Sequence, residues 1–373
     1  MTTRSMKVVV LGLSLSSSWG NGHATTYRAL LKAFVARGHD VTFLERDVPW
    51  YAGPHRDLAS PDWCRLLFYK DTSELAAHRA LIAGADAVIV GSYVPDGVAV
   101  GRLVQDWARG VTAFYDIDTP VTLAKLARGD TEYVSPELIP GYDVYLSFTG
   151  GPTLDLLERR YGSPAARALY CSVDPAAYPP LGREKRWDLS YLGTYSPDRQ
   201  PVLERLLIEP ARRLPHLRFV VAGPQYPDDI AWPENVERFQ HVGPVDHPEF
   251  YAASRYTLNV TRADMVAAGW SPSVRLFEAA SCATPVISDV WRGIEDVLTP
   301  GREILLAMTS DEVVLTLADP DEQKPARLGE AARARILGAH TADCRAAELE
   351  GYLTEAAGRR REAEAPRLEA VAV

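Results

Sequence analysis

The chain has 373 residues, a length that predicts two ordinary domains with ample sequence to bury a core in each. Its apolar content of 47% and charged content of 24% are typical of a soluble globular protein, and its net charge of −9 gives no basic surface for nucleic acid. Four scattered cysteines without a CxxC pair argue against a disulfide framework and a zinc site. Because no apolar run reaches the length of about 18 residues that spans a membrane, we expect no membrane span and a cytoplasmic protein.

The amino-terminal half predicts a parallel sheet whose strands are followed by polar or glycine-containing loops. A helix is predicted over 24–37, and 49–80, which is rich in aromatic residues, is expected to be irregular. Ligands of doubly wound sheets bind outside the carboxyl ends of the strands, so we expect the loops after the strands to face a ligand cleft. The predicted strands are 7–12, 40–45, 87–90, 111–115 and 144–148.

The loop between the first strand and its helix is rich in serine and glycine and ends at Gly22 and His23. Glycine lets backbone N–H groups approach a ligand closely, although the loop has neither a P-loop ending nor G-x-G-x-x-G spacing. His23 stands at the helix start, where the helix dipole disfavours the charged imidazole, so that a neutral His23 can act as a base. A flexible loop and a helix-capping histidine are the structural alternatives.

Asp116 and Asp118 form a D-x-D triplet with Ile117 after the strand 111–115. Such a triplet imitates a metal motif, but two aspartates are the minimum for a metal that needs converging oxygen ligands, and we expect no metal here. We interpret Asp118 as an acceptor-recognition residue or general base. The alternative is a loop carboxylate that backbone N–H groups satisfy.

Residues 256–289 predict a strand, a loop, a helix and a second strand, the βαβ unit of a parallel sheet. Ser271 is expected to cap the helix, with Pro272 at its first position. A helix start binds anions, an arginine at Arg275 suits phosphate oxygens, and a carboxylate at Glu278 suits the hydroxyls of a ribose. The structural alternative is an Arg–Glu surface pair at i, i+3.

The string 261–305 closely resembles the carboxyl-terminal domain of the CgeB-like glycosyltransferases, which have the GT-B fold. The resemblance spans roughly 187–306, and the amino-terminal half is compatible with it. It implies an α/β protein in which two Rossmann-like domains with parallel sheets face a central cleft. It also implies that Glu278 holds the ribose of a nucleotide-diphosphate sugar and that the segment 271–275, with Ser273 and Arg275, faces the diphosphate.

The same resemblance implies further donor contacts in the carboxyl-terminal domain. It places the loop at Gly193, Thr194 and Arg199 over the phosphates, and the edge 240–243, with Val242, beside the base. Arg262 follows a strand directly and is expected to neutralise the leaving diphosphate together with Arg199 and Arg275, as a divalent ion would. A solvated cation at Arg199 and a salt bridge at Arg262 are the alternatives.

The expected organisation is an acceptor-side domain over 1–172, a linker over 173–186 and a donor domain over 187–340. A helix over 341–357 is expected to cross back to the first domain, and the charged tail 358–373 is expected to be disordered.

These features predict a metal-independent glycosyltransferase of the hexosyltransferase class, without cofactor, that moves a sugar from a nucleotide-diphosphate sugar to an unknown acceptor. A nucleotide-sugar epimerase of the same fold and a non-catalytic nucleotide-sugar-binding protein are the alternatives. Related retaining enzymes carry a second glutamate eight residues before Glu278, where this chain has Trp270, so retention does not follow. The base of the donor, which includes UDP among its candidates, and the oligomeric state stay open.

Overall fold

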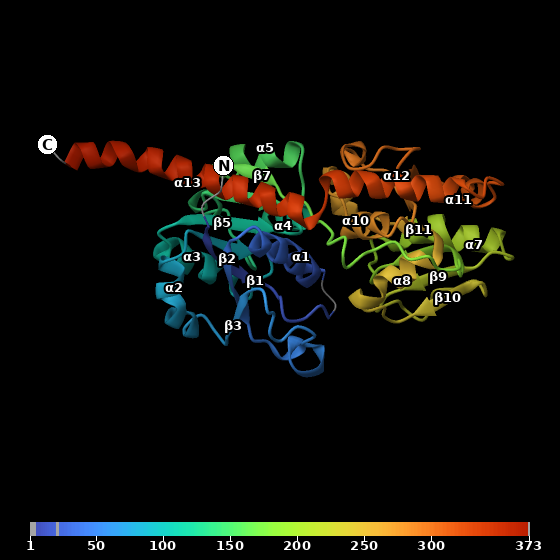
Figure 1. Ribbon diagram of the computed structural model, residues 1–373, viewed down its shortest axis with the longest axis horizontal. Coiled ribbons are helices and arrows are strands. Elements are labelled where there is room, and N and C mark those ends of the chain that lie inside the picture. The colour runs from blue at the N-terminus through green and yellow to red at the C-terminus, as the bar shows by residue number, and fades with distance from the viewer. Residues whose placement is uncertain (1–4, 20–21, 372–373) are drawn as a thin grey trace. The chain divides into compact units, whose positions relative to one another are not determined.

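The computed structural model describes residues 5–19 and 22–371, with the side chains of the last helix described as far as residue 363. The chain forms two compact units (Figure 1). The first contains the residues up to Tyr170 and those from Ala342 onward, and the second is Cys171–Thr341. In the described ranges, no helix is both long and apolar enough to cross a membrane.

The first unit is built on a seven-stranded parallel sheet of order β3-β2-β1-β4-β5-β6-β7. Its strands are β1 (Lys7–Gly12), β2 (Asp40–Arg46), β3 (Arg65–Tyr69), β4 (Ala87–Gly91), β5 (Val111–Asp116), β6 (Val144–Ser147) and β7 (Ala166–Ala168). Its α-helices are α1 (His23–Ala36), α2 (Arg79–Ala83), α3 (Gly97–Trp107), α4 (Thr119–Ala127), α5 (Pro152–Arg159) and α13 (Ala342–Val371). Short 3-10 turns occupy Pro49–Tyr51, Gly53–His55, Glu74–His78 and Ile139–Gly141.

The central strands of this sheet are hydrophobic on both faces because helices cover both sides of a doubly wound sheet. Every residue of β4 and β5 is buried. The alternate side chains of β1 therefore enter two separate packing layers, and Val9 and Leu11 lie in one of them with Val88, Val90 and Phe114.

The second unit is built on a six-stranded parallel sheet of order β10-β9-β8-β11-β12-β13. Its strands are β8 (Trp187–Leu192), β9 (Phe219–Ala222), β10 (Val236–Phe239), β11 (Ser254–Asn259), β12 (Val286–Ser288) and β13 (Leu305–Leu306). Its helices are α6 (Gln200–Leu203), a π-helix (Glu204–Ile208), α7 (Glu209–Arg213), α8 (His247–Ala252), α9 (Ala263–Ala268), α10 (Val274–Ser281), α11 (Ser310–Leu317) and α12 (Lys324–Ala339). Two 3-10 turns lie at Pro244–Asp246 and Ile294–Asp296.

Helix α10 connects β11 to β12, which are neighbours in the sheet, and it is deeply buried. All seven residues from Arg275 to Ser281 are buried, including the charged Arg275 and Glu278. Buried charges are costly unless they are paired or hydrogen-bonded, so the contacts of these two side chains carry information about the role of the helix.

The segment 49–80 differs from its prediction because it contains a regular strand. Strand β3 pairs with β2 from Thr42–Arg65 to Arg46–Tyr69 and forms one edge of the sheet. Its side chains are mostly half-exposed rather than alternating, so the period of two that identifies a strand is weak in the sequence.

The predicted linker 173–186 and the predicted tail also differ from the structure. The linker residues belong to the second unit, where Val173 forms a bridge with Thr341. Helix α13 packs against α1 (Figure 1) and continues to Val371, although disorder was expected from residue 358. Arg359 and Arg360 stabilise this continuation because they donate hydrogen bonds to the backbone oxygen and the carboxylate of Asp143. Residues 372–373 lie outside the described residues.

Candidate functional site

The carboxyl edge of the second sheet brings together Ser273 and Arg275, two of the predicted donor residues. Both donate to one atom, Asn259 Oδ1, at the end of β11: Ser273 Oγ at 2.6 Å and Arg275 Nη1 at 2.9 Å. Arg275 Nε also donates to the backbone oxygen of Leu192, at 2.6 Å, at the end of the neighbouring strand β8. The first turn of α10 is thereby tied to two adjacent strand ends.

Arg275 keeps part of its guanidinium group available at this edge. Its side chain is 8% exposed and lies over the Tyr191 ring, 5.0 Å from the centroid. Within the described residues, Arg275 Nη2 has no hydrogen-bond partner. A Cβ at Gly193 would lie 2.9 Å from Nη2, so glycine at this position leaves space in front of the guanidinium group. The arrangement suits an anion that approaches Nη2.

Asn259 is fully buried and was not identified from the sequence. Its Nδ2 donates to Thr261 Oγ1 at 3.2 Å and to Ser288 Oγ at 2.9 Å, which fixes the amide with Oδ1 toward Ser273 and Arg275. Asp289 in turn accepts from the Thr261 hydroxyl at 2.8 Å. An asparagine at a strand end is the only local signal, because its partners are distant in sequence.

The start of α10 differs from its prediction. The helix begins at Val274 with Ser273 as its N-cap, so Ser271 and Pro272 precede it. The Ser273 hydroxyl donates to Asn259 and accepts no capping bond from the helix. The first-turn N–H groups of α10 thus receive no side-chain cap, which leaves them suited to an anion.

The loop after β8 places Thr194 and Arg199 beside Gly193. Arg199 Nη2 donates to the Thr194 backbone oxygen at 2.7 Å, and Tyr226 donates to the Gly193 backbone oxygen at 3.1 Å. Arg199 Nε is buried and has no hydrogen-bond partner in the described part of the chain. The Arg199 guanidinium group therefore binds the backbone of the loop that precedes it. Arg199 is partly buried there and is not simply a cation surrounded by solvent.

Arg262 lies at the N-cap of α9 and shares an acidic neighbour, Asp198, with Arg199. Burial would raise the pKa of Asp198, but hydrogen bonds from Ser196 and the Ala263 N–H and the charges of both arginines lower it. Asp198 therefore stays ionised, and its negative charge lies beside both arginines. The role of Arg262 in neutralising the diphosphate stays a prediction, with a salt bridge as its alternative.

Glu278 lies one turn after Arg275 on α10 and does not pair with it. Its Oε1 accepts from Tyr178 Oη at 2.9 Å and its Oε2 accepts from Tyr251 Oη at 3.2 Å. His247 Nδ1 lies 3.6 Å from Oε2, while its Nε2 lies 3.3 Å from the backbone oxygen of Val242. His247 therefore lies between Glu278, the predicted ribose residue, and Val242 on the predicted base edge. The sequence did not indicate Tyr178, Tyr251 or His247.

In the first unit, the structure brings His23 and Asp118 together around Tyr93. Tyr93 Oη donates to Asp118 Oδ2 at 3.2 Å, and the His23 ring meets the Tyr93 ring edge-on, with centroids 5.2 Å apart. Burial lowers the pKa of His23, and the charge of Asp118 opposes that shift. His23 Nδ1 is buried without a hydrogen-bond partner in the described ranges. A neutral imidazole of this kind is suited to accept a proton.

Asp116 has a different environment from Asp118. It is fully buried and accepts hydrogen bonds from Tyr145 Oη at 2.5 Å, Thr122 Oγ1 at 2.9 Å and the Asp118 N–H at 3.2 Å. Burial raises its pKa to about 6. Its oxygens are thus used inside the fold, whereas Asp118 faces Tyr93.

Gly22 forms the N-cap of α1 and is exposed. A Cβ there would meet nothing within 4 Å, so no contact in the described structure requires glycine. Residues 20–21, which precede it, lie outside the described residues. A ligand contact at Gly22 remains a prediction.

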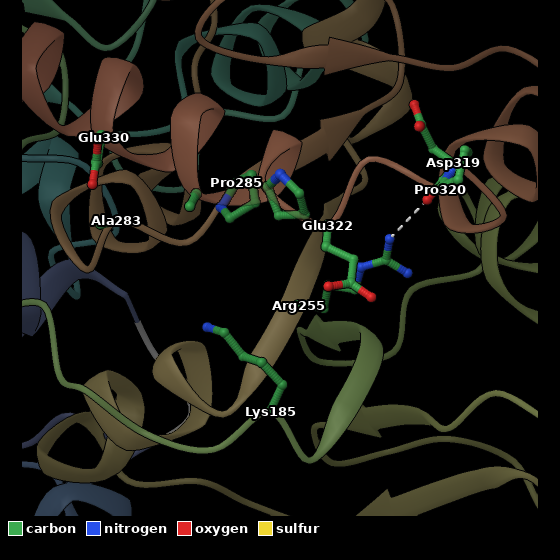
Figure 2. A pocket seen from close by; sticks show the side chains of 10 residues that line it. Lys185, Arg255, Ala283, Pro285, Asp319, Pro320, Glu322 and Glu330 are labelled. Atoms are coloured by element: carbon green, nitrogen blue, oxygen red, sulfur yellow. Dashed lines mark hydrogen bonds between the residues drawn. The ribbon is translucent and has the colours of Figure 1, made fainter.

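A cavity of 590 Å³ in the second unit lies at the opposite edge of the sheet (Figure 2). It is lined by residues at the amino ends of β8, β11 and β12, among them Lys185, Arg255 and Pro285. Both cations already bind backbone oxygens, Lys185 that of Ala252 and Arg255 those of Leu317 and Asp319. Because ligands of such sheets bind at the carboxyl ends of the strands, this cavity is not the candidate site.

A comparison with known protein families covers most of the predicted donor residues of the second unit. Residues 199–351 match a family model described as "Glycosyl transferase-like", and this range includes Arg199, Val242, Arg262, Arg275 and Glu278. A search of curated proteins finds no sequence match.

Solved structures of glycosyltransferases resemble the whole chain. A sucrose-phosphate synthase from Thermosynechococcus elongatus is 15% identical, with a TM-score of 0.68, over 94% of this chain and 98% of that one. The Anabaena protein Alr3699/HepE, solved with UDP and glucose, is 13% identical, with a TM-score of 0.69, over 94% and 100%. An alpha-glucosyltransferase, solved with UDP and a 13-mer DNA, is 12% identical, with a TM-score of 0.68, over 94% and 100%.

The structural matches confirm the predicted GT-B fold, and the family match confirms the predicted glycosyltransferase class. Neither resolves the CgeB-like subfamily. Residues 199–351 are thus similar to the glycosyl transferase-like family, and the two Rossmann-like units have the GT-B fold.

Proposed function

We propose that the protein transfers a sugar from a nucleoside diphosphate sugar to an acceptor hydroxyl without a metal ion, and that UDP is the nucleotide. The observation that carries this proposal is the meeting of Ser273 and Arg275 at Asn259 Oδ1, beside the uncapped start of α10. The choice of UDP rests on the structural neighbours that were solved with it. The string 261–305 favours the CgeB-like subfamily.

The proposed diphosphate lies against Arg275 Nη2 and the first-turn N–H groups of α10. Arg275 cannot turn away from this edge, since Nε and Nη1 are held by Leu192 and Asn259. A fixed guanidinium group needs little reorganisation when negative charge develops on the leaving diphosphate, so it stabilises the transition state more than a mobile cation would. Arg199 and Arg262 add positive charge from the loop after β8 and the start of α9.

The proposed ribose lies at Glu278, one turn further along α10. Three residues advance a helix by about 4.5 Å. Arg275 and Glu278 are therefore spaced along one helix in the order in which a nucleotide presents its diphosphate and its ribose. The Val242 backbone, which His247 joins to Glu278, is proposed to contact the base.

The proposed general base is His23, with Asp118 as its charge partner. His23 removes the proton of the acceptor hydroxyl as the acceptor oxygen bonds to the sugar carbon and the bond from that carbon to the diphosphate breaks. Asp118, oriented by Tyr93, stabilises the imidazolium that forms. The net charge of −9 argues against nucleic acid as the acceptor.

The absence of a metal from the mechanism is proposed on the chemistry of Asp116. Hard cations need several oxygen ligands that converge on one point. Asp116 is engaged with Tyr145 and Thr122 inside the fold, so its oxygens are not directed at a shared point with those of Asp118. The arginines supply the positive charge instead.

Replacing Arg275 tests the charge-neutralisation mechanism. Arg275→Ala should lower kcat about a hundredfold or more, because a preorganised donor to a developing charge is typically worth about 3 kcal/mol. Arg213→Ala, which removes a surface pair with Asp311, is the matched control and should leave kcat unchanged. Transfer is measured with UDP-glucose and an acceptor panel, and thermal melting checks that each variant folds.

The same mechanism predicts that EDTA does not affect the activity of the wild type. Loss of activity in EDTA with recovery in Mn²⁺ would contradict the mechanism.

Replacing His23 tests the base. His23→Ala should lower kcat by about 10²–10⁴-fold, the range for general-base catalysis. Calorimetric affinity for UDP should not change, since the proposed UDP contacts lie in the second unit. Because burial lowers the pKa of His23 from 6.5, the wild-type rate should be constant above neutral pH and fall only as the pH drops below 6.5. Exposed His216 is the control, and full activity of His23→Ala would remove His23 from the mechanism.

The pH dependence of stability tests the assignment of Asp116 as a buried structural carboxyl. The folded pKa, about 6, lies above the ordinary value of 3.8, so the unfolded chain releases the proton first and stability is lost as pH rises between these values. Two units correspond to about 3 kcal/mol. Urea unfolding at pH 4 and 7 should therefore show wild type losing up to this amount relative to Asp116→Asn. A difference that is flat or that grows with pH would show that the carboxyl is not held in its neutral form.

A further inference from the structure

The carboxylate of Glu278 is surrounded by three side chains that come from two separate segments. Tyr178 precedes β8 in the chain, whereas His247 begins α8 and Tyr251 lies on the same helix. Both tyrosine hydroxyls donate to the carboxylate, one to each oxygen, and the carboxylate itself is 6% exposed. The proposed ribose residue is therefore already part of a network before any ligand binds.

Both tyrosines must remain protonated donors in this network. Burial, and next the negative charge of Glu278, raise the pKa of Tyr178 and of Tyr251. Each hydroxyl lies within hydrogen-bonding distance of Glu278, and Tyr178 Oη lies 2.9 Å from Glu278 Oε1 and 3.3 Å from His247 Nδ1. The carboxylate is thus turned and held by two fixed donors.

The remaining acceptor capacity of Glu278 matches a diol. An ionised carboxylate offers about four lone-pair sites on its two oxygens. Tyr178 and Tyr251 use one site on each oxygen, which leaves one site on each. Two adjacent ribose hydroxyls can donate to these two sites together, whereas a 2′-deoxyribose can fill only one.

Tyr178 is fixed at two points on α10. Its hydroxyl donates to Glu278, and its backbone oxygen accepts from Ser281 Oγ at 2.8 Å. The same segment approaches the start of α10 through Cys171 Sγ, which donates to the Pro272 backbone oxygen at 3.3 Å. The chain that enters the second unit is therefore bound along the helix that carries the proposed donor residues.

We propose that Tyr178 and Tyr251 are positioning residues that orient Glu278 to recognise both hydroxyls of the donor ribose, and so set the preference for ribonucleotide over 2′-deoxyribonucleotide donors. His247 lies between this arrangement and the base edge, with Nδ1 3.3 Å from Tyr178 Oη and Nε2 3.3 Å from the Val242 backbone oxygen. The inference rests on the proposed function, because it assumes a nucleoside diphosphate at this edge.

The test compares Tyr178→Phe with wild type in calorimetric titrations with UDP and with 2′-deoxy-UDP. The variant removes one hydroxyl and no ring. A hydrogen bond to a charged group is worth about 1.5–3 kcal/mol, and only part of this is lost when Glu278 becomes less well oriented. UDP affinity should therefore fall about five- to tenfold. The affinity for 2′-deoxy-UDP should fall less, so that the ratio of the two dissociation constants moves toward one.

Tyr256→Phe is the matched control. Tyr256 is also a buried tyrosine of the second unit, on β11, but its hydroxyl has no hydrogen-bond partner in the described part of the chain. This variant should leave both affinities unchanged. If thermal melting shows that Tyr178→Phe does not fold, Tyr251→Phe takes its place, with the same direction of change expected.

The possible outcomes separate the inference from the function on which it rests. Equal loss of affinity for both nucleotides, or a Tyr178→Phe variant that behaves like Tyr256→Phe, would overturn the positioning role while leaving UDP binding intact. A wild-type protein that binds no nucleoside diphosphate would overturn the proposed function and the inference together. A reduced discrimination ratio, with the fold intact, supports the inference.

Discussion

The hydrogen bonds that converge on Asn259 Oδ1 determine how the donor side of this protein is built. They fix the Ser273 hydroxyl and the Arg275 guanidinium group at one point on the carboxyl edge of the sheet. Asn259 is itself held by Thr261 and Ser288, so the point does not move with the loops around it. Burying an arginine costs free energy unless its nitrogens make hydrogen bonds. Two of the three guanidinium nitrogens of Arg275, Nε and Nη1, make such bonds here.

Helix α10 combines two tasks that follow from its short connection between neighbouring strands. Its first turn presents N–H groups and Arg275 to an anion, and its second turn presents Glu278 to hydroxyl groups. Both side chains are buried, and their spacing is set by the helix itself. The loop after β8 must then pass close to the guanidinium group, which Gly193 permits.

Much of the fold is encoded locally and could be predicted. Runs such as Val111–Tyr115, with apolar and β-branched residues, are buried on both faces and identify central strands. The edge strand β3 has half-exposed side chains, and its sequence predicts an irregular segment. The helical continuation from 358 was missed because it depends on Arg359 and Arg360 reaching Asp143, more than 200 residues away in the sequence.

The candidate site also contains residues that the sequence indicated and partners that it did not. His23, Asp118 and Arg275 lie shortly after strands or at helix starts, where the topology places functional groups, and Glu278 lies one turn after Arg275. The sequence indicated all four. Their partners were not visible because contact depends on the fold: Tyr178 and Glu278 are 100 residues apart, and Arg275 and Leu192 are 83 apart. The role of Ser271 as a cap was wrong because Ser273 is better placed to bind Asn259 than to cap its own helix.

The central claim is that the carboxyl edge of the second sheet binds a nucleoside diphosphate, and a crystal structure of the protein with UDP tests it most directly. We predict the diphosphate within hydrogen-bonding distance of Arg275 Nη2 and the first-turn N–H groups of α10, with both ribose hydroxyls on Glu278. Density for UDP in the cavity lined by Lys185 and Arg255, or only in the first unit, would contradict the account.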